Sequence, residues 1–163
     1  MKLSKKVVLL GHFGVGKTSL FRRFIDNEFS EDYKVTLGVQ IKKKIVEMPD
    51  GRELSMIIWD TEGHTDIEDT RKSYLLGSNT FIYVFDINRI DTYKDIQQDL
   101  SYLTKNHPKI GIKVIGNKLD LVKESETIKK LEELKIPFDC LTSAKTNKNV
   151  QDFFQDLAKD LTK

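Results

Sequence analysis

The sequence predicts an α/β domain in which a largely parallel β-sheet carries helices on both faces. Short apolar runs alternate along the chain with segments of helical period, and a glycine-rich loop separates the first apolar run from the first helical segment. Polar motifs also follow several of the later apolar runs, where an open α/β sheet binds its ligands. The length of 163 residues suits a single domain, which we expect to span residues 1–163.

The first elements are a strand over residues 5–10 and a helix over residues 17–27. Apolar side chains recur on one face of this helix with the period of 3.6 residues that a core-facing helix requires. Residues 28–38, which follow, are polar and have no clear period. We therefore expect a mobile loop there.

Two strand-like segments, residues 39–48 and 53–60, are joined by Pro49-Asp50-Gly51-Arg52. This turn sequence predicts an antiparallel hairpin. The first strand carries the only basic cluster of the chain, which consists of Lys42, Lys43 and Lys44. At a sheet edge, lysines discourage pairing with other chains, and we favour this role over nucleic-acid binding.

A second polar stretch, residues 61–71, precedes a regular alternation of elements. Asp91 and Ser125 are the expected N-caps of two helices, and Pro108 ends the first of them because the residue before a proline avoids helical geometry. The predicted strands are 80–86, 112–116 and 138–142, and the predicted helices are 72–76, 91–105, 125–134 and 147–161.

The glycine-rich loop has the sequence GHFGVGKT at residues 11–18, which matches the pattern G-x-x-x-x-G-K-[ST]. Such a loop curls round an anion, so that successive backbone N–H groups and a helix N-terminus point at a polyphosphate. We expect Lys17 to reach the β- and γ-phosphates and Thr18 to ligate Mg²⁺. A plain glycine turn is the alternative. The predicted phosphate-binding residues are Gly14, Val15, Gly16, Lys17, Thr18 and Ser19.

The predicted strand at residues 53–60 ends in a D-x-x-G motif formed by Asp60 and Gly63. Asp60 is suited to hold Mg²⁺ through a water molecule. Gly63 lets its own N–H approach a γ-phosphate that a Cβ atom would obstruct. The alternative is an ordinary turn at the end of a strand.

Asn117-Lys118-Leu119-Asp120 follows the strand at 112–116 and predicts the base-binding loop. The carboxylate of Asp120 can accept hydrogen bonds from N1–H and the 2-amino group of guanine, and adenine has no such pair of donors. Asp120 should therefore select GTP over ATP. We expect Asn117 to tie this loop to the phosphate loop, the stem of Lys118 to cover the base, and the Ala144 N–H within Ser143-Ala144-Lys145 to meet the guanine carbonyl.

The composition excludes several other classes of protein. The net charge of +2 is too balanced to indicate binding to nucleic acid or to a lipid surface. The single cysteine, Cys140, excludes an intramolecular disulfide and fits a reducing compartment, where a buried structural thiol is expected. We find no signal peptide, membrane span or lipidation motif, so we expect a cytoplasmic monomer without a direct membrane anchor.

With these motifs in this order and at these spacings, the chain resembles a small GTPase of the Ras superfamily over nearly its whole length. The resemblance implies a three-layer G domain whose six-stranded sheet has the order 2-3-1-4-5-6 with strand 2 antiparallel. It also identifies residues 28–38 as switch I, where Phe29 packs on guanine, Tyr33 covers the phosphates, and Thr36 ligates Mg²⁺ and senses the γ-phosphate. Trp59 and Thr36-Leu37-Gly38-Val39 are most similar to the Rab branch.

Three residues depart from the family pattern where hydrolysis occurs. Phe13 replaces a glycine of the phosphate loop, and we expect it to crowd the γ-phosphate and to obstruct an arginine supplied by an activator. Glu62 adds a negative charge beside the triphosphate, which disfavours closure unless it points outward or pairs with a cation such as Arg71. His64 occupies the position that orients the attacking water. The alternative is an exposed loop histidine without a catalytic role.

The resulting hypothesis is a molecular switch that binds GTP or GDP with Mg²⁺ and hydrolyses GTP slowly, with Lys17, Thr36, Gly63 and His64 as the catalytic group. Effectors, exchange factors and activators would bind switch I, switch II at residues 61–71, and the hairpin face around Val39, Ile41 and Trp59. The alternatives are a GTP-bound scaffold that does not hydrolyse, a phosphate-loop ATPase or nucleotide kinase, which Asp120 disfavours, and an interaction domain with a vestigial site.

Overall fold

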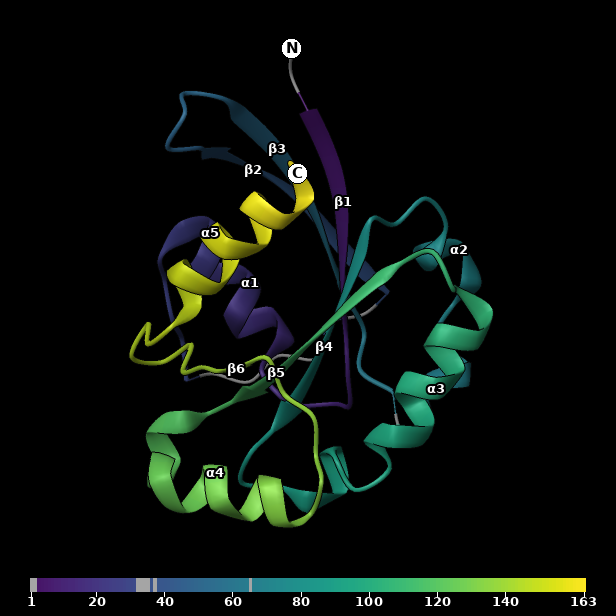
Figure 1. Cartoon of the computed structure of the whole chain (residues 1–163), viewed down its shortest axis with the longest axis vertical. Helices are drawn as coiled ribbons and strands as arrows, with labels where there is room; N and C mark the ends of the chain where they lie inside the picture. The colour runs from purple at the N-terminus through teal and green to yellow at the C-terminus, as the bar shows by residue number, and fades with distance from the viewer. Residues whose placement is uncertain (1–2, 32–35, 37, 65) are drawn as a thin grey trace.

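The computed structural model describes residues 3–31, 36, 38–64 and 66–163. Within them, six strands form one sheet of order β2-β3-β1-β4-β5-β6, in which only the β2–β3 pair is antiparallel. This arrangement confirms the predicted fold (Figure 1). The strands are β1 Leu3–Leu10, β2 Val39–Glu47, β3 Glu53–Thr61, β4 Thr80–Asp86, β5 Gly111–Asn117 and β6 Cys140–Leu141.

Helices follow most of the strands. The α-helices are α1 Lys17–Asp26, α2 Lys72–Leu75, α3 Ile96–Asn106, α4 Glu124–Glu133 and α5 Val150–Leu161, and the short 3₁₀ turns are η1 Ile67–Asp69, η2 Ile90–Thr92 and η3 Leu119–Leu121. In Figure 1, α1 and α5 lie to one side of the sheet and α2 and α3 to the other. No helix of the described part of the chain is long and apolar enough to cross a bilayer.

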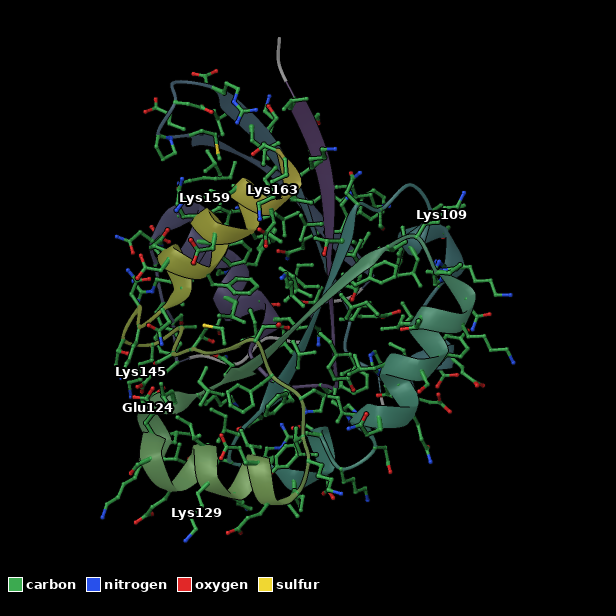
Figure 2. All side chains as sticks on the ribbon, viewed as in Figure 1. Lys109, Glu124, Lys129, Lys145, Lys159 and Lys163 are labelled. Atoms are coloured by element: carbon green, nitrogen blue, oxygen red, sulfur yellow. The ribbon has the colours of Figure 1, made fainter. Side chains whose placement is uncertain are left out.

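Alternation along the strands gives the sheet two apolar faces. In β1, Val7 and Leu9 face a core that includes side chains of α1 and α5, whereas Val8 and Leu10 face a core that includes side chains of α3 and α4. All four side chains are fully buried, as expected for a central strand covered on both faces. In Figure 2, side chains fill the space between the sheet and the helices, while the labelled Lys129 lies at the lower edge of the molecule.

The parallel register places the carboxyl ends of the central strands side by side. Leu9 of β1 is level with Asp60 of β3 and with Ile82 of β4, and Asp86 at the end of β4 is level with Asn117 at the end of β5. The polar residues that follow these strands therefore meet at one edge of the sheet, where ligands bind in open α/β folds.

The helix predicted to begin near Asp91 begins only at Ile96. The hydroxyl of Thr92 accepts a hydrogen bond from the N–H of Asp86 and lies 2.7 Å from the carbonyl oxygen of Arg89, which it can donate to. These contacts fold residues 90–92 into the 3₁₀ turn η2. Asp91 is therefore not a helix cap.

The predicted strand at 138–142 is reduced to Cys140–Leu141. Asp139 stands where pairing with β5 would begin, and its carboxylate, in place of a backbone carbonyl, accepts the hydrogen bond of the Val114 N–H at 2.7 Å. Burial and the nearby carboxylates of Asp139 and Asp152 raise the pKa of the half-buried Cys140 thiol to about 11. This agrees with a structural thiol, although it is less buried than predicted.

Two other helix starts differ from the prediction. The helix α4 begins at Glu124, with Lys123 at its N-cap position, so Ser125 lies inside the first turn. The helix α5 begins at Val150, because Asn147 and Asn149 adopt left-handed backbone conformations with φ of 62° and 64°. Asparagine tolerates this conformation better than most residues, and the pair forms a turn in place of the predicted helical residues.

The strand that carries the lysine cluster, β2, lies at the sheet edge, as predicted. Lys42 forms an ion pair with Asp26 at 3.4 Å, and the ammonium of Lys44 donates to the Ile25 carbonyl at 3.3 Å. Lys43 is exposed on the same strand. The charges therefore line an open edge, as proteins use them to discourage pairing with other chains.

Replacing Phe154 with alanine should destabilise the fold strongly. The rings of Phe24 in α1 and Phe154 in α5 stack with centroids 4.0 Å apart and an interplanar angle of 8°, and Phe154 is fully buried. We expect Phe154→Ala to lower the free energy of unfolding by about 3 to 5 kcal/mol, measured by urea denaturation. Ile90→Ala, at a side chain that is 49% exposed, should cost less than about 0.5 kcal/mol. Similar costs for the two variants would contradict the assignment of Phe154 to the core.

Candidate functional site

The phosphate loop connects the end of β1 to α1 and depends on glycine conformations. Gly11, Gly14 and Gly16 all have positive φ, and Gly16 is at the N-cap position of α1 with φ of 100°. A Cβ atom at Gly16 would lie 2.2 Å from Nδ2 of Asn117. Glycine is therefore required here both by the backbone conformation and by the close approach of another loop.

Lys17 extends its ammonium group back along this loop. The Nζ atom donates to the carbonyl oxygens of Gly11 at 3.0 Å and His12 at 2.8 Å. The side chain is only 5% exposed, and burial lowers its pKa to about 8, an effect that the negative charge of Asp60 opposes. The Lys17 ammonium thus lies within the loop at the carboxyl end of β1, where it would attract an anionic ligand.

Thr18, Thr36 and Asp60 form a cluster of oxygen atoms beside Lys17. The hydroxyl groups of Thr18 and Thr36 are 2.7 Å apart, and Thr18 donates to Oδ2 of Asp60 at 2.7 Å. Asp60 is fully buried, and its Oδ1 has no hydrogen-bond partner among the described residues. Burial raises the pKa of Asp60, and the threonine hydrogen bonds and Lys17 oppose this rise.

This donor set fits a magnesium ion. Mg²⁺ prefers hard oxygen ligands and is commonly held by one or two carboxylates together with hydroxyl, water or phosphate oxygens. A buried carboxylate oxygen without a partner costs free energy that a cation would recover. The three residues predicted as metal ligands are therefore brought together by α1, switch I and β3.

Asn117 links three loops through its side chain. Its Nδ2 donates to the carbonyl oxygen of Val15 at 3.1 Å, as predicted for the tie to the phosphate loop. Its Oδ1 accepts hydrogen bonds from Thr142 Oγ1 at 3.0 Å and from the Ala144 N–H at 3.3 Å. The Ala144 N–H, predicted to meet the guanine carbonyl, is therefore directed toward Asn117 in this structure.

The carboxylate of Asp120 is held by Ser143, whose hydroxyl donates to Oδ1 at 2.7 Å. Asp120 and Lys118 line the same cavity. Lys145 forms an exposed ion pair with Glu31 at 2.6 Å, and the Lys145 carbonyl accepts from Arg23 of α1 at 2.9 Å. These contacts fix the 143–145 loop against α1 and switch I.

One cavity of about 270 Å³ unites these parts. Of the residues predicted to bind nucleotide, those that line it are Gly14, Gly16, Lys17, Thr18, Ser19, Phe29, Thr36, Gly63, Asn117, Lys118, Asp120, Ala144 and Lys145. Val15 and Ser143 lie behind the lining and support it through their hydrogen bonds with Asn117 and Asp120. Tyr33, also predicted, lies outside the described residues.

The cavity also contains residues that the motifs did not identify. Arg22 lines it, and because it lies four residues after Thr18 in α1 it shares the same helix face, a spacing that could have identified it. Glu28, Ser30, Glu31, Thr61 and Leu121 line it as well. Thr61 lies inside the D-x-x-G motif and Glu28, Ser30 and Glu31 lie within residues 28–38, but only the folded arrangement shows that they line the cavity.

Phe13 projects from the phosphate loop over Gly63. Its side chain is 42% exposed and lines the cavity. A Cβ atom at Gly63 would lie 2.5 Å from Cα and 2.7 Å from Cδ1 of Phe13, so the two residues are in intimate contact. The bulky side chain is therefore beside the glycine whose N–H is expected to meet a γ-phosphate.

His64 is not the exposed loop histidine considered as an alternative. It is only 4% exposed, its ring lies 5.5 Å from that of His12 and 6.4 Å from that of Tyr83, and it does not line the cavity. Neither ring nitrogen has a hydrogen-bond partner among the described residues. Burial, with smaller contributions from Lys17 and His12, lowers the pKa of His64 to about 3. The ring is neutral in this position.

Glu62 connects switch II to switch I. Its carboxylate accepts a hydrogen bond from the Gly38 N–H at 3.3 Å, and its own N–H donates to the Gly38 carbonyl at 2.8 Å. No ion pair joins Glu62 to Arg71 among the described residues; Arg71 lies over the ring of Tyr74 at 5.8 Å. Glu62 therefore joins residues 61–64 to Gly38, and the expected effect of its charge on a triphosphate stays a prediction.

The comparison with known families agrees with this geometry. A family model described as the Ras family matches residues 6–163. The match covers nearly the whole chain, including every element that contributes to the cavity.

The buried position of His64 should make stability depend on pH. The unfolded histidine has a pKa of about 6.5 and binds a proton as the pH falls below it, whereas the folded ring, with a pKa of about 3, does not. Stability should therefore fall as pH decreases, by at most about 1.4 kcal/mol per pH unit between about pH 6 and pH 4. Urea denaturation of wild type and His64→Leu at each pH isolates this term. An equal pH dependence in both proteins would show that His64 is not buried as a neutral ring.

Proposed function

Because this chain belongs to the Ras family of GTP-binding small GTPases, we propose that it forms a single G domain that hydrolyses GTP slowly and signals through two switch segments. The observation that carries the proposal is the single cavity lined by the phosphate loop, Thr36, Gly63 and the loops at residues 117–120 and 144–145. Each of these parts contacts a different portion of a guanine nucleotide in the proposed complex.

Guanine selectivity is assigned to Asp120. The Ser143 hydroxyl fixes Oδ1 of Asp120, so the carboxylate has a defined orientation before the base arrives. Its acceptors match the N1–H and 2-amino donors of guanine, and a site that pairs with those donors would reject a base that lacks them. Phe29 and the Lys118 stem, which both line the cavity, would cover the base.

The phosphates would bind in the curve of residues 14–19, with Lys17 compensating the charge of the β- and γ-phosphates. Thr18, Thr36 and Asp60 are proposed to hold Mg²⁺, which supplies charge stabilisation for phosphoryl transfer when bound. The carbonyl contacts of Lys17 would then be exchanged for phosphate oxygens. Gly63 would present its N–H to the γ-phosphate.

Partner binding is assigned to the two switches and the adjoining hairpin face. Thr36 and Gly63 both line the cavity, so the nucleotide state can be sensed by each switch. On the hairpin, Ile41 is 49% exposed and pairs in register with Trp59, whose ring is covered by the Lys6 ammonium at 3.6 Å. Such an aromatic and aliphatic surface suits effector or regulator proteins. Trp59 on this surface and the sequence of residues 36–39 are most similar to the Rab branch, which is therefore the proposed subgroup.

Slow hydrolysis follows from the positions of Phe13 and His64. Phe13 contacts Gly63 and occupies the space through which an arginine from an activator would enter. His64 could orient the attacking water only after leaving its place beside His12 and Tyr83. The rearrangement adds to the barrier for hydrolysis. The same two observations favour a second candidate function, a GTP-bound scaffold with no measurable turnover.

Substitution of Asp120 tests guanine selectivity. Asp120→Ala should weaken GDP binding by at least about 100-fold and leave the weak binding of ADP unchanged, because only guanine uses the carboxylate. Ser143→Ala is the matched control, since it retains the carboxylate and removes only its support, with an expected loss of about 5-fold. Competition against a fluorescent GDP analogue measures both. Equal loss of GDP and ADP binding in Asp120→Ala would contradict the assignment.

Single-turnover hydrolysis of preloaded GTP tests the damped active site. Phe13→Gly should raise the rate by about 10-fold or more by freeing the space beside Gly63, and His64→Ala should lower it. Wild-type hydrolysis as fast as in rapid members of the family would contradict the proposal. An inert wild type that neither substitution changes would establish the scaffold function.

A further inference from the structure

Asp86, at the carboxyl end of β4, is a buried charge that the motifs do not explain. The residue is 1% exposed and does not line the cavity. A carboxylate removed from water costs several kcal/mol unless cations or hydrogen-bond donors surround it. Its Oδ1 accepts from the Asn88 N–H at 2.9 Å, and its Oδ2 faces two cations.

The closer cation is Lys118, whose Nζ lies 3.0 Å from Oδ2 of Asp86. Asp86 is level with Asn117 in the β4–β5 register, so Lys118 leaves β5 directly beside the carboxylate. The backbone of Lys118 has φ of 72°, a conformation uncommon for residues other than glycine, and its side chain also lines the cavity. The charge at the tip of Lys118 is therefore anchored while the stem lies along the wall.

The second cation is Arg89, which connects the same carboxylate to the phosphate loop. Its Nη1 lies 4.0 Å from Oδ2 of Asp86 and donates to the carbonyl oxygen of Phe13 at 3.1 Å. Asp86 thus lies between a residue of the base-binding loop and a residue that contacts the phosphate loop.

We infer that Asp86 is a positioning residue for guanine-nucleotide binding, which it promotes by anchoring the Lys118 ammonium so that the lysine stem forms one wall of the base site. The inference rests on the proposed function. A free lysine stem would lose several rotatable bonds of conformational freedom on covering a base, and the anchor fixes them in advance. The base is common to GDP and GTP, so the contribution is equal for both nucleotides.

The test is the dissociation rate of a fluorescent GDP or GTP analogue in excess Mg²⁺. Asp86→Asn should accelerate release about 10-fold, and equally for GDP and GTP, because it removes the charge that pairs with Lys118. Lys118→Met, which keeps an apolar stem of similar length, should show a similar acceleration. In the double variant Asp86→Asn/Lys118→Met, release should be within about 2-fold of Lys118→Met alone. Asp160→Asn, at an exposed carboxylate that pairs with Lys113, is the matched control and should release GDP like wild type.

Wild-type release by Asp86→Asn, or an undiminished effect of Asp86→Asn in the Lys118→Met background, overturns the inference. Wild-type chain that does not bind GDP at all would instead refute the proposed function. Thermal unfolding verifies that each variant is folded, and Asp86→Ser replaces Asp86→Asn if the latter does not fold. If neither variant folds, the dissociation rate from Lys118→Met decides the test. A rate equal to that of wild type overturns the inference, and a rate that is accelerated equally for GDP and GTP supports it.

Discussion

The side chain of Asn117 is the contact on which the site depends most. One amide group donates to Val15 in the phosphate loop and accepts from Thr142 and Ala144 in the loop after β6. The approach is so close that residue 16 has no room for a Cβ atom. The phosphate loop, the end of β5 and the loop after β6 are thereby held together, although Val15 and Thr142 are more than a hundred residues apart in the sequence. Removal of this amide would leave buried donors and acceptors without partners on the phosphate loop and on the loop after β6.

Buried charge is the second constraint. Lys17, Asp60 and Asp86 are all nearly inaccessible, and each lies at or just beyond the carboxyl end of a central strand. The ammonium of Lys17 is compensated by loop carbonyls. The carboxylate of Asp86 is compensated by Lys118 and Arg89. The carboxylate of Asp60 accepts threonine hydrogen bonds on one oxygen only. The incomplete compensation of Asp60 and Lys17 suits ligands of opposite charge, whereas the fuller compensation of Asp86 suits a supporting role.

The hydrolytic side of the site is arranged differently from the binding side. Most residues proposed to bind nucleotide converge on the cavity, but Phe13 packs on Gly63, and His64 is buried beside Tyr83. Glu62 meanwhile joins the switches through both hydrogen bonds with Gly38. In the proposed function, contacts within the protein thus favour binding, and the proposed water-orienting His64 is held away from the cavity.

The sequence by itself determined the fold class, the strand order through the family resemblance, and most of the cavity lining, because the glycine-rich loop and Asn117–Asp120 are local patterns with few structural interpretations. The exact starts of α3 and α5 were not predictable. The Thr92 hydroxyl accepts a hydrogen bond from the Asp86 N–H, and the Asn149 side chain donates to the Leu141 carbonyl. These contacts lie outside the two helices, so the helical period of the sequence does not reveal them. Only the tertiary structure decided the burial of His64, the partner of Glu62 and the ion pairs of Asp86. Side-chain direction in a loop, and the pairing of a buried charge, depend on neighbours that the sequence does not place next to one another.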